Sequence, residues 1–210
     1  MLKKLIISLS VLFLYTSCTR TVNEYYPNGK LRYSCEMKAG KKHGTEKRWY
    51  ENGRLQSEFL YSEGLLNGKA CRWFFNGNLE SENYYVNDKL NGTSTLWDED
   101  GYITIEKTYI NDTLNGIYKE WHANGQIKVE GSFVDGFFNG KWIYYSAAGF
   151  ITGEGVFDMG SGVLKGYDAK GCLIREVSYV NNKKNGEEKH YTSSGNIEKI
   201  VVYKEGRIIK

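Results

Sequence analysis

Residues 49–68 read WYENGRLQSEFLYSEGLLNG, and residues 121–140 read WHANGQIKVEGSFVDGFFNG. Both stretches contain an aromatic residue, an Asn-Gly pair, an aliphatic residue two positions later, a glutamate, a second aromatic residue and a closing Asn-Gly pair. Versions of the pattern recur with steps of 24, 24, 24, 24, 24, 22 and 24 residues between the first glycines. These glycines are Gly29, Gly53, Gly77, Gly101, Gly125, Gly149, Gly171 and Gly195. The pattern indicates eight repeat units, and the short step predicts that the sixth unit lost two residues in a turn near Met159 to Gly162.

Each unit is expected to form two β-strands. A Leu or Ile lies two residues after each first glycine and an aromatic residue or Met lies six residues later, so both side chains point to one face. The aromatic residue before each Asn-Gly turn, such as Trp49, is expected to pair with the following aliphatic residue, such as Leu55, across a hairpin. Consecutive hairpins predict an all-β fold, in which tandem 24-residue repeats form an elongated, twisted antiparallel meander that stays open or curls over its aromatic face.

The first residues predict export and a lipid anchor. Lys3 and Lys4 precede an apolar stretch from Leu5 to Tyr15, which is too short to cross a hydrocarbon core of about 30 Å. Residues 16–18, Thr-Ser-Cys, resemble a bacterial lipobox, in which the cysteine is acylated and becomes the mature N-terminus. The predicted organisation is a lipoprotein signal peptide over 1–17, lipid attachment at Cys18 in the cell envelope, a short linker over 18–24 and a repeat domain over 25–210. The alternative is ordinary cleavage nearby, with Cys18 as an incidental thiol.

The overall charge gives no reason to expect nucleic-acid binding. The formal net charge is +3, and it falls to about +1 when the two lysines of the expected signal peptide are removed.

The recurring motif Y/W-x-x-N-G-x-L/I-x-x-E-x-x-Y-x-x-G-x-x-N-G resembles the MORN-repeat variant of bacterial proteins of the YwqK antitoxin type. Residues 40–44, GKKHG, are close to the G-x-x-H-G core of the original MORN repeat. The resemblance covers about residues 25–206 and implies a β-hairpin repeat architecture. Original MORN repeats are associated with membrane and protein recognition, and the YwqK type carries an antitoxin description. Because the chain is predicted to be exported, an antitoxin or immunity role implies a target in the envelope.

We expect no catalytic site, cofactor or metal. His43, His122 and His190 occupy different repeat positions, so they do not form a column of metal ligands. Cys35 and Cys71 are expected three strands apart, about 14 Å, which is too far for a disulfide. No nucleotide-binding loop or nucleophile motif occurs.

A glutamate column is expected to be structural. Its members would lie about 9.5 Å apart in an aligned sheet, and a feature repeated six times is typical of pairing with neighbouring Lys and Arg or with turn amides. The column consists of Glu58, Glu82, Glu106, Glu130, Glu154 and Glu176.

An irregular aromatic stretch supplies the candidate partner site. Between residues 131 and 153 only Asp135 and Lys141 are charged, and aromatic residues accumulate. The candidate partner-binding patch is Tyr118, Phe137, Phe138, Trp142 and Tyr144. The alternative is that the sheet curls here and covers these residues itself. The leading hypothesis is therefore non-catalytic binding of an unidentified protein, with antitoxin activity as one alternative.

A third hypothesis is glycan or lipid-headgroup binding by the tryptophan column. The column consists of Trp49, Trp73, Trp97 and Trp121. The sequence gives no indication of oligomeric state.

Overall fold

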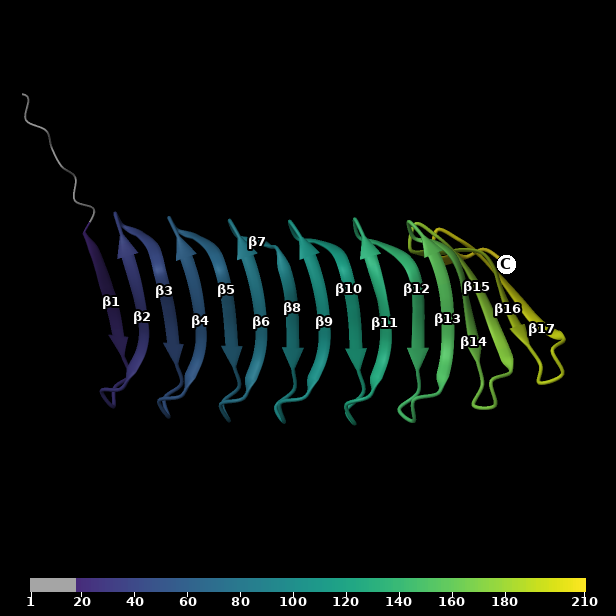
Figure 1. Cartoon of the computed structure of the whole chain (residues 1–210), viewed down its shortest axis with the longest axis horizontal. Helices are drawn as coiled ribbons and strands as arrows, with labels where there is room; N and C mark the ends of the chain where they lie inside the picture. The colour runs from purple at the N-terminus through teal and green to yellow at the C-terminus, as the bar shows by residue number, and fades with distance from the viewer. Residues whose placement is uncertain (1–17) are drawn as a thin grey trace, which may run out of the picture.

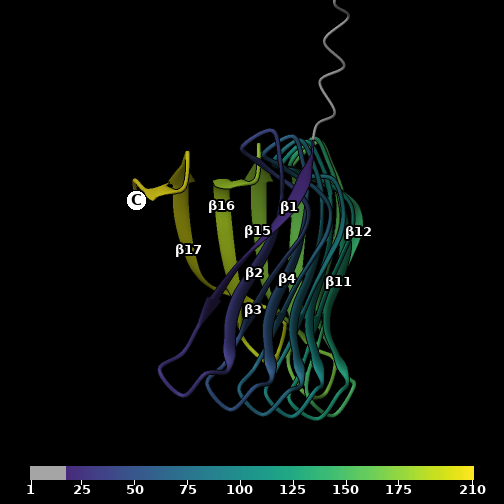
Figure 2. The same ribbon diagram turned by 90° about the vertical axis from the view of Figure 1, so that its left-hand side faces the viewer.

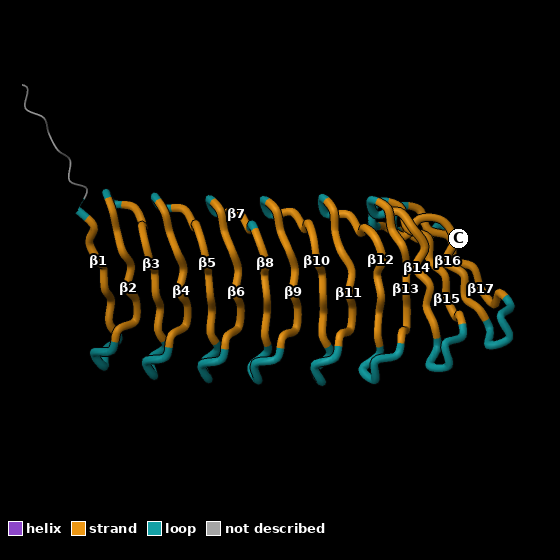
Figure 3. The backbone as a smooth tube through the Cα atoms, in the orientation of Figure 1, coloured by secondary structure: helices purple, strands orange, loops and turns teal. Residues whose placement is uncertain are grey.

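The computed structural model describes residues 18–210, and in that range the chain forms one long antiparallel sheet with no helix (Figure 1). Each strand pairs with its neighbours in chain order, so the backbone runs up and down as a meander (Figure 3). The predicted all-β repeat fold is confirmed. The strands are β1 (Thr19–Tyr25), β2 (Leu31–Lys38), β3 (Lys41–Trp49), β4 (Leu55–Ser62), β5 (Leu65–Trp73), β6 (Leu79–Val86), β7 (Lys89–Leu90), β8 (Gly92–Trp97), β9 (Ile103–Ile110), β10 (Thr113–Trp121), β11 (Ile127–Val134), β12 (Phe137–Tyr145), β13 (Ile151–Asp158), β14 (Ser161–Tyr167), β15 (Leu173–Val180), β16 (Lys183–Tyr191), β17 (Ile197–Lys204) and β18 (Arg207–Ile208).

The N-terminal segment differs from the expectation. Residues 18–24 are predicted to be a linker, whereas β1 begins at Thr19 and pairs with β2 from Thr19 opposite Lys38 onward. The β-branched residues Thr19, Thr21 and Val22 suit an extended strand, which explains the difference. The predicted signal peptide over 1–17 lies outside the described residues.

Two kinds of turn alternate along the sheet, at its lower and upper edges in Figure 1. The lower turns carry the first glycine of each unit, and Gly53 there has a φ of 90°. The upper turns are tight, and in the β9–β10 turn Asn111 and Asp112 have φ values of 49° and 67°. Positive φ at both central residues is the geometry that two-residue hairpins require, and Asn, Asp and Gly adopt it most readily.

Hydrogen bonds also join successive turns along both edges. At the upper edge the Asp112 backbone N–H donates to the Leu90 carbonyl at 2.9 Å, and equivalent bonds span 22 residues at the other upper turns. At the lower edge the Tyr50 hydroxyl donates to the Trp73 carbonyl at 2.8 Å. The upper turns are therefore joined along the whole described sheet, and several lower turns, among them those of Tyr26, Tyr50 and His122, are joined as well.

The regular upper hairpins contain a bulge that the sequence pattern did not predict. In β9–β10, Leu114 lies opposite Tyr109 and Tyr118 lies opposite Lys107, so three residues of β10 face only Thr108. Gly116 lies within this bulge and has a φ of 114°. The second glycine of each regular repeat is therefore the bulge glycine.

The sixth unit lacks this bulge. The β13–β14 ladder runs without interruption from Gly153 opposite Gly166 to Asp158 opposite Ser161. Its turn still has the usual two residues, Met159 and Gly160, both with positive φ. The prediction that two residues were lost from the turn is wrong, because they were lost from the strand that follows it.

The end of the sheet after this unit curls. In Figure 2 strands β15–β17 turn away from the line of the earlier strands. Asn182, in the β15–β16 turn, reaches back two repeats, where its side-chain oxygen accepts from the Phe138 N–H at 2.8 Å and its amide donates to the Gly136 carbonyl at 2.7 Å. These bonds join the upper turns on either side of the sixth-unit turn, where the sheet begins to curl.

Gly160 is expected to be indispensable to this curl. A Cβ at Gly160 would lie 2.6 Å from the Asn182 side-chain oxygen, and the residue has a φ of 78°. We predict that Gly160→Ala lowers the free energy of unfolding by more than the 1–3 kcal/mol or so of backbone strain alone. Urea denaturation followed by circular dichroism measures the change.

Gly171→Ala is the matched control, because Gly171 has a φ of 81° and no neighbour within 4 Å of a Cβ. Equal losses in the two variants would contradict a specific role for the contact between Gly160 and Asn182.

Candidate binding surface

One continuous row of side chains crosses the middle of the sheet and defines its inner face. Each side chain of this row lies beside the next one on the neighbouring strand, and Gly131 packs directly against Trp142. We call this set the inner row; it comprises Cys35, Glu46, Phe59, Ala70, Asn83, Ser94, Lys107, Tyr118, Gly131, Trp142, Gly155, Leu164, Val177 and Glu188. Two of its charged members, Glu46 and Glu188, lie near the ends, and Trp142 lies where the sheet begins to curl.

The curl encloses a hydrophobic cluster on the inner face. Val129, Phe133, Trp142 and Phe157 are buried together, and Trp142 is only 2% exposed. The Phe138 and Phe133 rings lie 4.7 and 5.1 Å from the Trp142 ring between centroids, in edge-to-face geometry. Trp142 also donates its indole N–H to the Ser132 carbonyl at 3.1 Å. This is the best-packed apolar core in the described part of the chain.

Glycines make room for the Trp142 indole. A Cβ at Gly131 would overlap the indole ring, and Gly155 lies directly opposite Trp142 on β13. The aromatic residue and the small residues on both sides of it therefore form one packing unit, which explains why glycines interrupt β11 and β13.

The predicted partner-binding patch lies largely in this core. Trp142 is buried, and Tyr118, Phe138 and Tyr144 are half-buried and packed against the cluster. Phe137 is half-buried at the start of β12, beside the Gly160 turn. Trp142 is therefore a core residue, as the alternative interpretation of a self-covering curl expects. Tyr144 in addition lines a hollow of about 280 Å³ that contains Gly153, Gly166 and Arg175.

The glutamate column lies on the opposite, outer face and makes ion pairs. The Lys47–Glu58, Lys69–Glu82, Lys141–Glu154 and Lys165–Glu176 pairs have N–O distances of 3.1, 2.5, 3.3 and 4.0 Å. The predicted pairing with neighbouring lysines is confirmed. Because these groups are substantially exposed, each pair contributes little stability, typically below about 1 kcal/mol.

The tryptophan and tyrosine column shares the outer face with the glutamates. Tyr145 donates to Glu130 at 2.7 Å, and Tyr191 donates to Glu176 at 2.6 Å. The expected pairing of Trp49 with Leu55 would put this column on the aliphatic face, and Glu58, an odd number of residues after Leu55, on the other face. Each lower hairpin contains a register shift, such as that between Arg48 and Trp49, and the shift moves the aromatic residue to the glutamate face.

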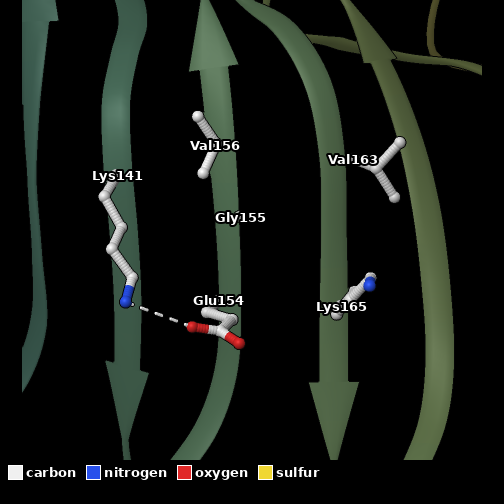
Figure 4. Close-up of a pocket in the computed structure, with 6 residues that line it drawn as sticks. All are labelled: Lys141, Glu154, Gly155, Val156, Val163 and Lys165. Atoms are coloured by element: carbon white, nitrogen blue, oxygen red, sulfur yellow. Dashed lines mark ion pairs between the residues drawn. The ribbon is translucent and has the colours of Figure 1, made fainter.

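An apolar hollow interrupts the charged rows of the outer face (Figure 4). Val156 and Val163 lie opposite each other on β13 and β14, and they are 68% and 43% exposed. Gly155 beside them has no side chain, and Lys141, Glu154 and Lys165 complete the lining of a hollow of about 610 Å³. We call this the outer hollow. It lies on the opposite side of the sheet from the buried cluster. Packing of that cluster therefore fixes the strands that line the hollow.

The missing bulge creates this feature. In the regular repeat at β9–β10 the equivalent of Val163, Ile117, lies within the bulge and shares the equivalent of Val156, Thr108, with Asn115 and Gly116. In the sixth unit the uninterrupted ladder brings Val156 and Val163 directly opposite each other. Neither residue was singled out from the sequence. The only sequence feature that pointed to this site was the two-residue deletion in the sixth unit.

Two buried carboxylates occupy the inner row near its ends. Glu188 pairs with Arg175 and Lys184, both at 2.7 Å, and Glu46 pairs with Lys42 and Arg48. Burial by itself raises the pKa of Glu188, but hydrogen bonds from Lys184 and Arg175 lower it to about 2. Both carboxylates are thus held by two cations, which is a structural arrangement.

The other chemistry-bearing residues are dispersed. His122 contacts the Tyr145 carbonyl at 2.9 Å as part of the lower-edge turn contacts, and His190 lies 3.1 Å from Glu188. Cys35, Cys71 and Cys172 are free thiols. Over residues 18–210 no three His, Cys, Asp or Glu side chains are grouped so that they could hold a metal ion. No helix in the same range is sufficiently long and apolar to span a membrane.

Comparison with known families identifies the repeat. The family model described as MORN repeat variant matches residues 21–39, 42–63, 66–87, 114–135 and 184–205, slightly more than half of the chain. None of the curated proteins matches the chain. The matched segments leave out residues 136–183, which contain the sixth unit and two of the four buried cluster residues, Trp142 and Phe157.

We predict that Trp142→Ala destabilises the fold rather than acting on a surface. Removing a buried indole from this cluster is expected to lower the free energy of unfolding by about 3–5 kcal/mol. Val156→Ala, at an exposed position behind the cluster, is expected to change it by less than about 0.5 kcal/mol. Urea titration of both variants tests the assignment, and a stable, fully folded Trp142→Ala protein would overturn it.

Stability is also expected to depend on acid pH through Glu188. Because its pKa in the fold is about 2 against an ordinary 4.5, its ionised form stabilises the fold above about pH 4.5. That contribution is lost as the pH falls toward 2. Glu188→Gln should therefore be less stable at pH 7, by about 1.5–3 kcal/mol, and should differ little from the parent near pH 2.

Glu198→Gln is the control, since Glu198 is exposed on the neighbouring strand β17. Thermal unfolding at a series of pH values measures both variants. A Glu188→Gln deficit that stays constant across the series would contradict the ionic explanation.

Proposed function

Because this chain belongs to the MORN repeat variant family, we propose that it is a non-catalytic binding protein that recognises a protein partner through the outer hollow. We propose further that it is exported and held at the bacterial envelope by a lipid on Cys18. The observation that carries the binding proposal is the exposed Val156–Val163 pair beside Gly155, whose two side chains lie directly opposite each other on an outer face that also carries rows of ion pairs.

The chemistry of the outer hollow supports a protein partner. An apolar side chain can fill the space above Gly155, between the two valines, and remove apolar surface from water. Lys141, Glu154 and Lys165 then provide a polar rim of both charge signs. An apolar centre with a polar rim is the usual composition of a recognition site between proteins.

The position of Cys18 supports the proposed anchor. Cys18 is exposed and directly precedes β1, whose first residue lies at the upper edge of the sheet (Figure 1). No spacer separates a lipid at Cys18 from the first strand. A lipidated chain would therefore keep the upper turns close to the bilayer, with the outer hollow accessible from the side.

The partner's identity distinguishes the finer alternatives. Capture of a toxin would support the YwqK-type antitoxin role, and capture of an envelope component would support a scaffold role. Binding of glycans or lipid headgroups would instead involve the outer tryptophans, Trp49, Trp73, Trp97 and Trp121, all of which are half-buried.

Site-specific photocrosslinking in intact cells tests the binding proposal. With p-benzoylphenylalanine in place of Val156, we expect one specific protein to be captured. The matched control carries the same probe in place of Tyr84, which stands at the same repeat position and is 39% exposed. The same products from both positions, or none from Val156, would refute the outer hollow as the site.

Fractionation of the same cells tests the anchor. The Cys18→Ser chain is expected to leave the membrane fraction and to lose incorporation of labelled palmitate. Unchanged membrane association and labelling would contradict lipid attachment at Cys18, and would leave the crosslinking result to be judged separately.

A further inference from the structure

The two ends of the sheet are open in different ways. At the N-terminal end, β1 pairs with β2 along one side. At the C-terminal end, β18 covers only the upper part of β17, with Ile208 opposite Tyr203 and Arg207 opposite Lys204. The Ile209 N–H then donates to the Val202 carbonyl at 2.8 Å, and the chain ends at Lys210. In the described chain, residues 197–201 of β17 pair with β16 alone.

Repeat positions show that these ends are complementary. Lys210 lies four residues after the turn glycine Gly206, as Gly44 lies four residues after Gly40. Thr21 lies 24 residues before Thr45, so it stands at the position that follows Gly44. Ile209 and Lys210 thus stand at repeat positions within the bulge, and β1 from Thr21 onward carries the repeat positions that follow them.

We infer that a second copy of this chain docks its β1 against the open part of β17, so that chains associate head to tail. β17 corresponds to β2 and β1 corresponds to β3, so β1 of the second copy has the strand direction that the antiparallel sheet requires. In the β2–β3 ladder Cys35 lies opposite Glu46. The equivalent pair between copies is Val201 opposite Val22.

The neighbouring positions of this register are also compatible. Lys199 of one copy faces Glu24 of the next, and an opposite-charge pair across antiparallel strands is stabilising. Val22 and Val201 are both half-buried and extend the inner row from one chain into the next. The backbone N–H and C=O groups on the open side of residues 197–201 gain partners, as edge strands generally tend to do.

Docking of a second copy also requires the last residues of the first copy to change position. Ile209 and Lys210 occupy the repeat positions of Thr19 and Arg20, so the last two residues of one copy must move aside when the next copy docks. Ile209 is 62% exposed, and displacing these two residues breaks the backbone hydrogen bonds from the Ile209 N–H to the Val202 carbonyl and from the Val202 N–H to the Lys210 carbonyl, both 2.8 Å. Because the contact joins unlike surfaces, repetition produces a linear array along the axis of the sheet rather than a closed dimer.

Disulfide crosslinking of the full-length chain in its native membranes tests the register. With Val22→Cys and Val201→Cys in one chain, mild oxidation is expected to produce a ladder of dimers and larger species on a non-reducing gel. The offset pair, Val22→Cys with Lys199→Cys, keeps the same face of the sheet but is expected to give only the background of the single variants. An equal ladder from the offset pair, or a ladder from Val22→Cys alone, would overturn head-to-tail docking.

Three further variants test head-to-tail docking without depending on disulfide formation. Glu24→Lys is expected to weaken association by about two- to fivefold, and adding Lys199→Glu is expected to restore it. Deleting Ile209 and Lys210 is expected to strengthen association, because it removes the obstacle to β1. No charge-swap rescue together with weaker association after the deletion would contradict the proposal. These outcomes are independent of partner capture at the outer hollow.

Discussion

Hydrogen bonds between consecutive turns are the constraint on which the rest of this structure depends. A single-layer sheet has no second layer to fix the position of its strands, so spacing has to be set within the layer. The upper turns do this with a backbone bond across 22 residues, of which Asp112 to Leu90 is one, and the lower turns add bonds such as Tyr50 to Trp73. The constant repeat length follows from these contacts, because a repeat of another length would misalign donor and acceptor.

In the sixth unit the bonds between turns are kept although the strand has lost its bulge. Its turn keeps the 22-residue bond from Asn182 to Gly160, but its strand lacks the bulge. The Asn182 side chain reaches past this turn to Gly136 and Phe138, two repeats back, and the sheet bends around Trp142. One local change therefore produces both the buried cluster on the inner face and the exposed Val156–Val163 pair on the outer face. Stability and the proposed recognition surface share one cause.

The sequence predicted the repeats, the strands and the meander because each rests on spacing that recurs in every unit. It also predicted the ion pairs of the glutamate column, since those need only neighbouring strands. It failed where register depends on bulges. A bulge changes the face to which a residue points, so counting from Trp49 to Glu58 gave the wrong relation between the two columns. The outer hollow was missed for the same reason, as Val156 and Val163 meet only when a bulge is absent.

The strictly sequential pairing of the strands has a consequence for how the chain folds. Each strand contacts the strand just before it and the strand just after it, and the turn contacts extend only about one repeat further, apart from the Asn182 bridge. Contacts that are close in sequence close small loops and form quickly. A chain that becomes free to fold from its N-terminus can therefore add one hairpin at a time to a finished edge, without waiting for distant residues. The curl is the exception, and it can form only after the β15–β16 turn has been made.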